Sequence, residues 1–299
     1  MKIRLSENFR ALFYAPFYAI RALDLAAREG LEIEWLASSS PGSAIDGVKR
    51  GVIDVSWGGP MRVMKDHDST PANGESLVCF GEVVGRDPFC LVGKPRSALF
   101  QLTELASLRL GVVSEVPTPW LCLQGDLADA GVDVAAMRSA ENVRTGLTME
   151  QQLGALARDE LDVVQLFEPY ISRALRQGGG ILYAASSRGP TVYTTFMCSR
   201  DSAARLGGAF AALERAIRAM QGWMAANGPA ELARVAAPFF PELPADLFQE
   251  AIERYWKAGL WSRTPEISRA GFARLEYSLH VGGFIAMPQS YESCVHSFT

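Results

Sequence analysis

The segment GVIDVSWGGP, residues 51–60, decides the fold class of this chain. Its apolar run from Val52 to Trp57 is typical of a buried strand, and the glycines and proline that follow end this strand in a turn. The same alternation extends toward the N-terminus, with strands expected at residues 3–5 and 31–36 and helices at 16–30 and 43–51. This β-α-β-α-β order is typical of a parallel sheet covered by helices.

A second series of the same kind follows. Two β-rich runs occupy residues 77–84 and 88–92. Further strands are then expected at residues 108–113, 132–137, 161–167 and 181–185, with helices at 119–130 and 149–158. After a β-branched and aromatic run at 191–198, helical periodicity covers residues 203–226, 230–237, 245–258 and 266–279.

Two segments are expected to carry the chain between these series: one near residues 93–95, where glycine and proline punctuate the sequence, and one at 191–198. We therefore predict an α/β fold of two lobes, in which the second is inserted into the first. Residues 1–95 and 191–299 form the predicted first lobe, and residues 96–190 form the second.

Composition excludes several classes of protein. The 299 residues carry a formal net charge of −4 with an isoelectric point near 5.6, and no lysine-rich run occurs, so nucleic acid is not an expected partner. No apolar stretch reaches the about 18–20 residues that a membrane helix needs, so no membrane insertion is expected. The five cysteines are odd in number and widely spaced, which argues against a disulfide framework.

The N-terminal residues enter a strand pattern without the apolar region and cleavage site of a secretory signal. As it is written, the chain is therefore expected to stay in the cytoplasm. It is expected in the periplasm if the natural precursor is longer.

Five segments have a recognisable order and spacing: YAPFYA at 14–19, GLEI at 30–33, GVIDV at 51–55, LRLGV at 108–112, and LDVV through FEPY at 161–170. Together they resemble the family of type II periplasmic binding proteins that includes thiamine-pyrimidine precursor proteins and the binding proteins of nitrate, sulfonate and taurine transporters. The resemblance covers roughly residues 2–260. It implies two α/β lobes with a ligand held between them at the ends of strands.

The first candidate ligand contacts are Asn8, Phe9, Phe13 and Tyr14, which the resemblance places in the turn after the first strand. Aromatic side chains in such a turn can equally form a core cluster. A histidine often found near this turn in pyrimidine-handling relatives is Tyr14 here, which argues against pyrimidine chemistry.

The second candidate group is Ser56, Trp57, Gly58 and Gly59, at the end of the third strand. Glycines let the backbone approach a ligand, Ser56 offers a hydroxyl and Trp57 offers a broad aromatic face. The alternative is a helix start in which Ser56 is a local cap and Trp57 fills the core.

Two further candidate positions lie in the predicted second lobe. Ser114 and Thr118 precede a helix whose unpaired amides can bind an anion, although Thr118 can equally cap this helix ahead of Pro119. Glu168 is a carboxylate at a strand end, and its alternative role is to balance the dipole of the next helix.

Three arginines, Arg86, Arg144 and Arg188, lie near predicted strand ends, where a guanidinium can pair bidentately with an anion; a surface position is the alternative. Tyr193, in the return crossing, completes the predicted ligand contacts. The run DHD at residues 66–68 has no second histidine four residues on, so we interpret it as a solvated helix end and predict no metal site.

No common hydrolase, metal, redox or nucleotide motif occurs in the sequence, so we predict no catalytic residue and no cofactor. The predicted function is a solute-binding protein that closes on a small anionic or aromatic molecule of the sulfonate, carboxylate or pyrimidine class. Its predicted partners are that ligand and the membrane permease of an ABC transporter. The alternatives on this fold are a pyrimidine-precursor synthase, an aromatic sulfinate desulfinase and an aromatic-acid decarboxylase.

Overall fold

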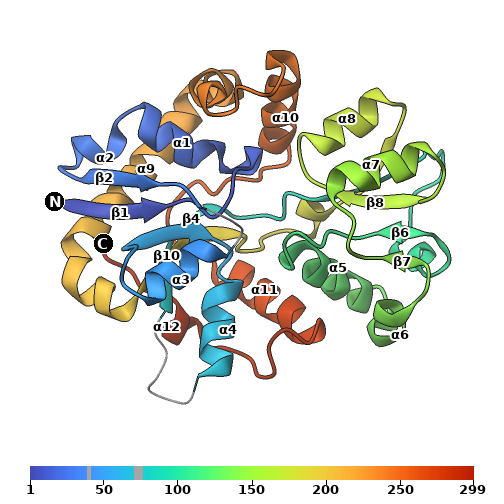
Figure 1. The fold of residues 1–299 in the computed structure, drawn as a ribbon, viewed down its shortest axis with the longest axis horizontal. Helices are drawn as coiled ribbons and strands as arrows, with labels where there is room; N and C mark the ends of the chain where they lie inside the picture. Colours follow the sequence, from blue (N-terminus) through green and yellow to red (C-terminus); the bar gives the residue numbers. More distant parts are fainter. Residues whose placement is uncertain (39–41, 71–76) are drawn as a thin grey trace.

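The computed structural model describes residues 1–38, 42–70 and 77–299. Two five-stranded sheets lie side by side in it, each covered by helices (Figure 1). The first sheet has the order β2-β1-β3-β10-β4. Its strands are β1 (Lys2–Ser6), β2 (Glu32–Leu36), β3 (Val55–Gly58), β4 (Leu77–Val84) and β10 (Thr194–Ser199).

The second sheet has the order β7-β6-β8-β5-β9. Its strands are β5 (Cys90–Gly93), β6 (Leu110–Gly111), β7 (Val143–Arg144), β8 (Val163–Leu166) and β9 (Gly180–Ala184). The described helices that accompany it are η2 (Leu102–Ser107), α5 (Thr118–Asp129), α6 (Val134–Ser139), α7 (Met149–Ala157), α8 (Tyr170–Arg176) and η3 (Ala185–Arg188). We call this sheet with its helices the second lobe.

The first lobe contains the other sheet and the remaining helices. Its N-terminal helices are η1 (Leu12–Tyr14), α1 (Ala15–Ala22), α2 (Leu25–Arg28), α3 (Ser43–Lys49) and α4 (Met61–Ser69). Its C-terminal helices are α9 (Arg200–Ala236), α10 (Ala245–Lys257), α11 (Arg269–Val281) and α12 (Tyr291–Cys294). Figure 1 shows α1 and α2 on one side of the first sheet and α3 and α4 on the other.

The first sheet follows the sequence pattern. β1 pairs in parallel with both β2 and β3, and Leu5 is the Cα partner of Trp35 on one side and of Val55 on the other. β10 returns from the second lobe and lies antiparallel between β3 and β4. Because the carboxyl ends of β1 and β3 point the same way, the turns after them meet at one edge of the sheet.

The passage between the lobes lies earlier than the expected position near residues 93–95. β5 already belongs to the second sheet, where Cys90 pairs with Leu166 of β8 and with Ala184 of β9. Its backbone hydrogen bonds are therefore satisfied by the second lobe, and the chain crosses between Val84 and Cys90. The return crossing joins β9 to β10, as the pattern at residues 191–198 predicts.

One other element differs from expectation. Residues 132–137 were predicted as a strand, but α6 begins at Val134, where the Asp133 side chain accepts a hydrogen bond from the Ala136 amide at 3.0 Å. The break expected between the helices at 203–226 and 230–237 is confirmed, because α9 is interrupted at Gly228, whose φ of 77° is not helical, ahead of Pro229. None of the described helices is both long and apolar enough to cross a lipid bilayer.

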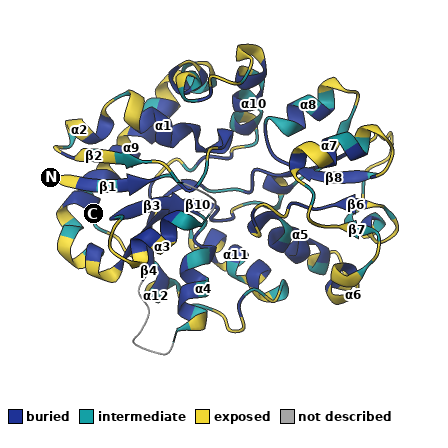
Figure 2. Cartoon of the chain, in the orientation of Figure 1, coloured by how far each residue is buried: buried dark blue, intermediate teal, exposed yellow. Residues whose placement is uncertain are grey.

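Buried residues follow both sheets and the helix faces turned toward them (Figure 2). The centre of the first lobe is an aromatic cluster around Trp57, which is 1% exposed and stacks on Phe17 with 4.7 Å between ring centroids. A second apolar cluster continues from α4 through α11 to α5, so it joins the two lobes. The lobes thus share packed surface outside the crossings.

Candidate ligand-binding cleft

The candidate site is a cleft between the lobes, where the turns after β1 and β3 face the start of α5. The first lobe contributes Asn8, Phe9, Phe13, Tyr14, Gly59, Met61, Arg62 and Tyr193, and the second contributes Val116, Pro117 and Thr118. The free volume between them is about 20 Å³, close to the space of one water molecule. A ligand larger than water must therefore enter while the lobes are further apart.

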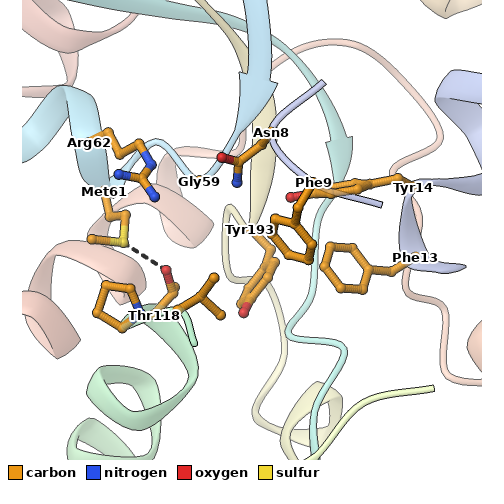
Figure 3. Close-up of a pocket in the computed structure, with 11 residues that line it drawn as sticks. Asn8, Phe9, Phe13, Tyr14, Gly59, Met61, Arg62, Thr118 and Tyr193 are labelled. Atoms are coloured by element: carbon orange, nitrogen blue, oxygen red, sulfur yellow. Dashed lines mark hydrogen bonds between the residues drawn. The ribbon is translucent and has the colours of Figure 1, made fainter. Parts of the chain in front are cut away.

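The charged group and the aromatic rings of the cleft lie on different sides of it. Figure 3 shows Arg62 and Thr118 facing the rings of Phe9, Phe13 and Tyr193, with the Asn8 amide between the two groups. A ligand with one charged end and one apolar end would match this division.

Arg62 is the strongest electrostatic feature of the cleft. It lies in the first turn of α4, is half-buried, and makes no hydrogen bond or ion pair with any residue of the described ranges 1–38, 42–70 and 77–299. Burial lowers the pKa of its guanidinium, because removing the charge from water is unfavourable, but arginine stays protonated in proteins. Asp46 favours the charged form of Arg62 through space. No described acidic side chain forms an ion pair with this guanidinium, so it can pair with an anion that enters the cleft.

Two tyrosines add neutral hydrogen-bond donors. Burial raises the pKa of Tyr14 to about 12 and raises the pKa of Tyr193 well above its ordinary value. Both phenols therefore keep their proton at neutral pH and can donate to an anion. The Asn8 side chain is held in place because its Oδ1 accepts a hydrogen bond from the Gly42 amide at 2.9 Å.

The apolar side of the cleft is built from edge-to-face rings. Phe13 is central: its ring centroid lies 6.0 Å from that of Phe9 and 5.9 Å from that of Tyr193, with interplanar angles of 77° and 89°. Such arrangements are favourable for aromatic pairs. Together the three rings give an apolar ligand body a rigid wall.

The two lobes touch directly within the cleft. The Thr118 hydroxyl donates to the Met61 sulfur at 2.7 Å, from the first residue of α5 to the first residue of α4. A Cβ atom added at Gly59 would stand 3.7 Å from Thr118 Oγ1 and 3.6 Å from the Tyr193 carbonyl oxygen. Because glycine has no side chain, the second lobe or a bound ligand can come close to the backbone at this position.

Seven of the fifteen residues predicted from the sequence lie at this cleft. Those that the structure brings together are Asn8, Phe9, Phe13, Tyr14, Gly59, Thr118 and Tyr193. That they touch a ligand stays a prediction. Ser114 is not among them, because its hydroxyl donates to the Leu147 carbonyl oxygen at 3.5 Å and accepts from the Gly146 amide, away from the cleft.

Trp57, Ser56 and Gly58 were predicted to contact the ligand, but they lie inside the first lobe. Trp57 packs in the aromatic core, and the Ser56 hydroxyl donates to the Trp57 carbonyl oxygen at 3.2 Å. A Cβ atom at Gly58 would meet the Met197 methyl group at 2.9 Å, so this glycine serves the packing of β3 against β10.

Glu168 and Arg86 also differ from prediction. The Glu168 side chain is fully buried, accepts from the Ser172 amide at 3.0 Å, and pairs with Arg254 at 2.7 Å. Burial raises the pKa of this carboxyl, and its role is to hold α8 against α10. The Arg86 guanidinium donates to the Ser186 carbonyl oxygen at 2.9 Å, which ties the two crossing segments together.

The other two candidate arginines lie away from the cleft lining. Arg188 is buried and pairs with Asp87 at 2.8 Å and with Asp126. Arg144 is exposed on β7. The run at residues 66–68, expected to be solvated, is partly buried: His67 Nε2 lies 2.9 Å from the Leu77 carbonyl oxygen. No group of three or more histidine, cysteine or acidic side chains suited to a metal occurs among the described residues.

Sequence reasoning missed Arg62 and Met61, and it named the segment 114–119 without choosing Val116 and Pro117 in it. A usable signal for Arg62 was present, because β3 ends at Gly58 and the first turn of the following helix must stand at the same sheet edge as the turn after β1. The candidate arginines taken from the sequence belong to other strands: Arg86 follows β4, Arg144 ends β7 and Arg188 follows β9.

These features define a class: the chain has the two-lobed fold of periplasmic binding proteins, with a cleft between interleaved lobes. Its backbone matches the periplasmic aliphatic sulphonate binding protein SsuA from Escherichia coli with a TM-score of 0.76, at 15% identity, covering 98% of this chain and 97% of that one. It matches the periplasmic nitrate-binding protein NrtA from Synechocystis PCC 6803 with a TM-score of 0.68, at 14% identity, covering 98% and 83%. The family resemblance is thereby confirmed at the level of the fold.

One curated sequence is similar over nearly the whole chain. It is named "Putative binding protein YtlA", from Bacillus subtilis (strain 168), and it is 22% identical over 309 residues, covering 99% of this chain and 87% of that protein. No protein-family model matches the chain.

Proposed function

We propose that this chain is a solute-binding protein whose lobes close on a small organic anion. The observation that carries the proposal is Arg62, a half-buried guanidinium in the cleft that makes no ion pair with any described residue. Asn8 and the phenols of Tyr14 and Tyr193 also line the cleft and can donate hydrogen bonds to an anion. The structural relatives named above are a sulphonate-binding and a nitrate-binding protein, which agrees with an anionic ligand.

An organic anion suits the cleft better than an inorganic one. Phe9, Phe13 and Tyr193 form an apolar wall opposite Arg62, and a bare anion would leave this wall without a contact. The apolar part of the ligand would gain burial of about 25 cal/mol per Å² against these rings. The proposed ligand is therefore a small sulfonate or carboxylate with an apolar or aromatic body.

We further propose that the ligand is released unchanged. A thiol nucleophile would need a lowered pKa and access to the cleft. Instead, burial raises the pKa of Cys90 and Cys198 to about 12, and raises the pKa of Cys79 and Cys122 as well. None of these four thiols lines the cleft.

The proposed partner is the membrane permease of an import system, because structural relatives of this chain are named as binding components of such systems. The compartment, cytoplasm or periplasm, stays a prediction from the sequence. Fractionation of cells that produce the natural gene product would decide between them.

Native mass spectrometry of the purified chain, followed by calorimetry with small sulfonates, carboxylates, pyrimidines and uncharged analogues, tests the proposal. We expect one anion per chain, recovered unchanged after release. Binding of uncharged analogues alone, or chemical conversion of any of these compounds, would contradict it.

A further inference from the structure

A second groove lies on the first lobe, away from the cleft. It is bounded by the middle of α9, the end of α10 and the segment after α10, and its volume is about 340 Å³. Pockets for small molecules typically begin at about 300 Å³. Unlike the cleft, this groove is large enough for a ring-sized molecule without movement of the lobes.

Two tryptophans form the wall of this groove. The ring centroids of Trp256 and Trp261 are 6.4 Å apart with an interplanar angle of 60°. Trp261 is fixed in orientation, because its Nε1–H donates to the Phe13 carbonyl oxygen at 2.9 Å. Met224 and Leu260 extend the apolar lining, so the groove offers a flat ligand aromatic faces and aliphatic contacts.

One polar group in the lining has an unused acceptor. Gln221 is 4% exposed, and its Nε2 donates to the Glu82 carbonyl oxygen at 3.0 Å, which sets the orientation of the amide. The Gln221 Oε1 atom has no hydrogen-bond partner in the described part of the chain. A buried acceptor without a donor is unfavourable, and a donor on a bound molecule would correct this.

We propose that this groove is a second small-molecule site, which takes a planar aromatic molecule carrying a hydrogen-bond donor. The ring lies against Trp256 and Trp261, and the donor reaches Gln221 Oε1, which is closed to solvent in the empty groove, once the lining side chains shift on binding. The site does not depend on the function proposed for the cleft. It is nevertheless joined to the cleft, since Trp261 holds the backbone of Phe13, whose ring lines the cleft.

The probes are 5-fluoroindole and its N-methyl derivative, which differ in the N–H donor, observed by fluorine NMR with the purified full chain. We expect 5-fluoroindole to bind and the N-methyl compound to bind about tenfold more weakly or not at all. The blocking variant is Gly222→Leu, because a Cβ atom at Gly222 has nothing within 4 Å and the new side chain would fill the groove. We expect this variant to lose at least tenfold in affinity.

Gly208→Leu is the matched control, because it is the same change in the same helix, outside the groove, where a Cβ atom makes only an ordinary contact of 3.6 Å with Met1. It should bind as the unchanged protein does. Trp256→Ala, at a half-buried position, is a second blocking variant if Gly222→Leu does not fold. Absence of binding, or equal binding in the Gly222→Leu and control proteins, would overturn the site, and equal binding of both probes would overturn the role of Gln221.

Discussion

Thr118 Oγ1 lies 2.7 Å from Met61 Sδ, and this hydrogen bond joins the first residues of two helices that belong to different lobes. Both residues also line the cleft. The contact thus holds the lobes together at the place where a ligand would have to enter. Opening of the cleft must break it.

Thr118→Val tests this relationship, because valine keeps the shape of threonine and removes the hydroxyl. We expect the ligand-free protein to become more open in solution, seen as a larger radius of gyration by X-ray scattering. Ligand affinity should fall by about two- to tenfold, the effect of one neutral hydrogen bond. Thr103→Val, on the surface of the second lobe, is the control. An unchanged radius of gyration would show that the contact does not hold the lobes closed.

Arg62→Met should weaken binding of an organic anion by about 10- to 150-fold, which corresponds to the loss of about 1.5–3 kcal/mol from charge-assisted hydrogen bonds. The stability of the empty protein should change little, because the variant no longer buries the charge but also loses the attraction between Arg62 and Asp46. Calorimetry measures the affinity, and thermal unfolding measures the stability. The exposed Arg144→Met is the matched control and should leave both quantities unchanged.

Trp57→Ala should act on stability and not on binding. The side chain is 1% exposed and stacks on Phe17, so its removal leaves a cavity in the core of the first lobe. We expect the free energy of unfolding to fall by about 3–5 kcal/mol, measured by urea denaturation. Affinity measured well below the melting temperature should change less than about twofold. A large loss of affinity with unchanged stability would show that Trp57 contacts the ligand.

Local and long-range features of this fold differ in how well the sequence predicts them. The alternation of strands and helices is local, so the parallel arrangement of β1, β2 and β3 and the return of β10 follow from it. The pairing of β5 with β8 and β9 is long-range, and no local signal assigns a short apolar run to one sheet or the other. The run at 132–137 is ambiguous by periodicity, and the Asp133 cap was the signal that favours a helix.

The site was predicted at strand ends, and that rule located the turn after β1, the turn after β3 and the start of α5. It could not choose between neighbouring side chains. Trp57 and Gly59 are two residues apart, yet one is inside the core and the other lines the cleft, because β3 is buried on both faces. Which side chain of such a strand reaches the cleft depends on where the strand ends, and this is the least predictable part of an element.

Glu214 should give the protein a pH-dependent stability. Its side chain is buried, and its Oε2 accepts from the Phe298 amide at 3.0 Å and the Thr299 hydroxyl at 3.1 Å. Burial raises the pKa of this carboxyl above its ordinary value of 4.5, although these two bonds oppose the shift. The folded state therefore holds the proton more tightly, and the stabilisation is present below pH 4.5 and lost as pH rises through the higher folded pKa.

Glu214→Gln keeps an oxygen that can accept both hydrogen bonds and removes the charge. We expect it to be more stable than the unchanged protein near neutral pH, with the difference shrinking to zero as the pH approaches 4.5. Urea denaturation at several pH values measures this, and the exposed Glu141→Gln should show no such trend. A constant difference at all pH values would mean that the charge of Glu214 does not contribute.

Helices α5 and α11 pack against each other between the lobes, and Gly125 is a tight point of this packing. A Cβ atom at Gly125 would stand 2.5 Å from Ser278 Oγ and 3.2 Å from Ser278 Cβ. Near it, Arg274 of α11 pairs with Asp126 of α5 at 2.7 Å. We therefore expect the packing to resist any side chain at Gly125, because rotating the Ser278 hydroxyl away leaves the second contact in place.

Gly125→Ala separates two opposite effects. A glycine-to-alanine change inside a helix normally stabilises by about 0.5–1 kcal/mol, and Gly222→Ala, where a Cβ atom meets nothing, should show this gain. At Gly125 we expect a loss instead, because α5 and α11 must move apart. Adding Ser278→Gly removes the two nearest opposing atoms, Oγ and Cβ, and leaves only the Cα atom of residue 278 at 3.3 Å. The double variant should therefore be more stable than Ser278→Gly alone, as measured by urea denaturation. A gain from Gly125→Ala by itself would mean that the helices have room to spare and that the lobes are not fixed at this point.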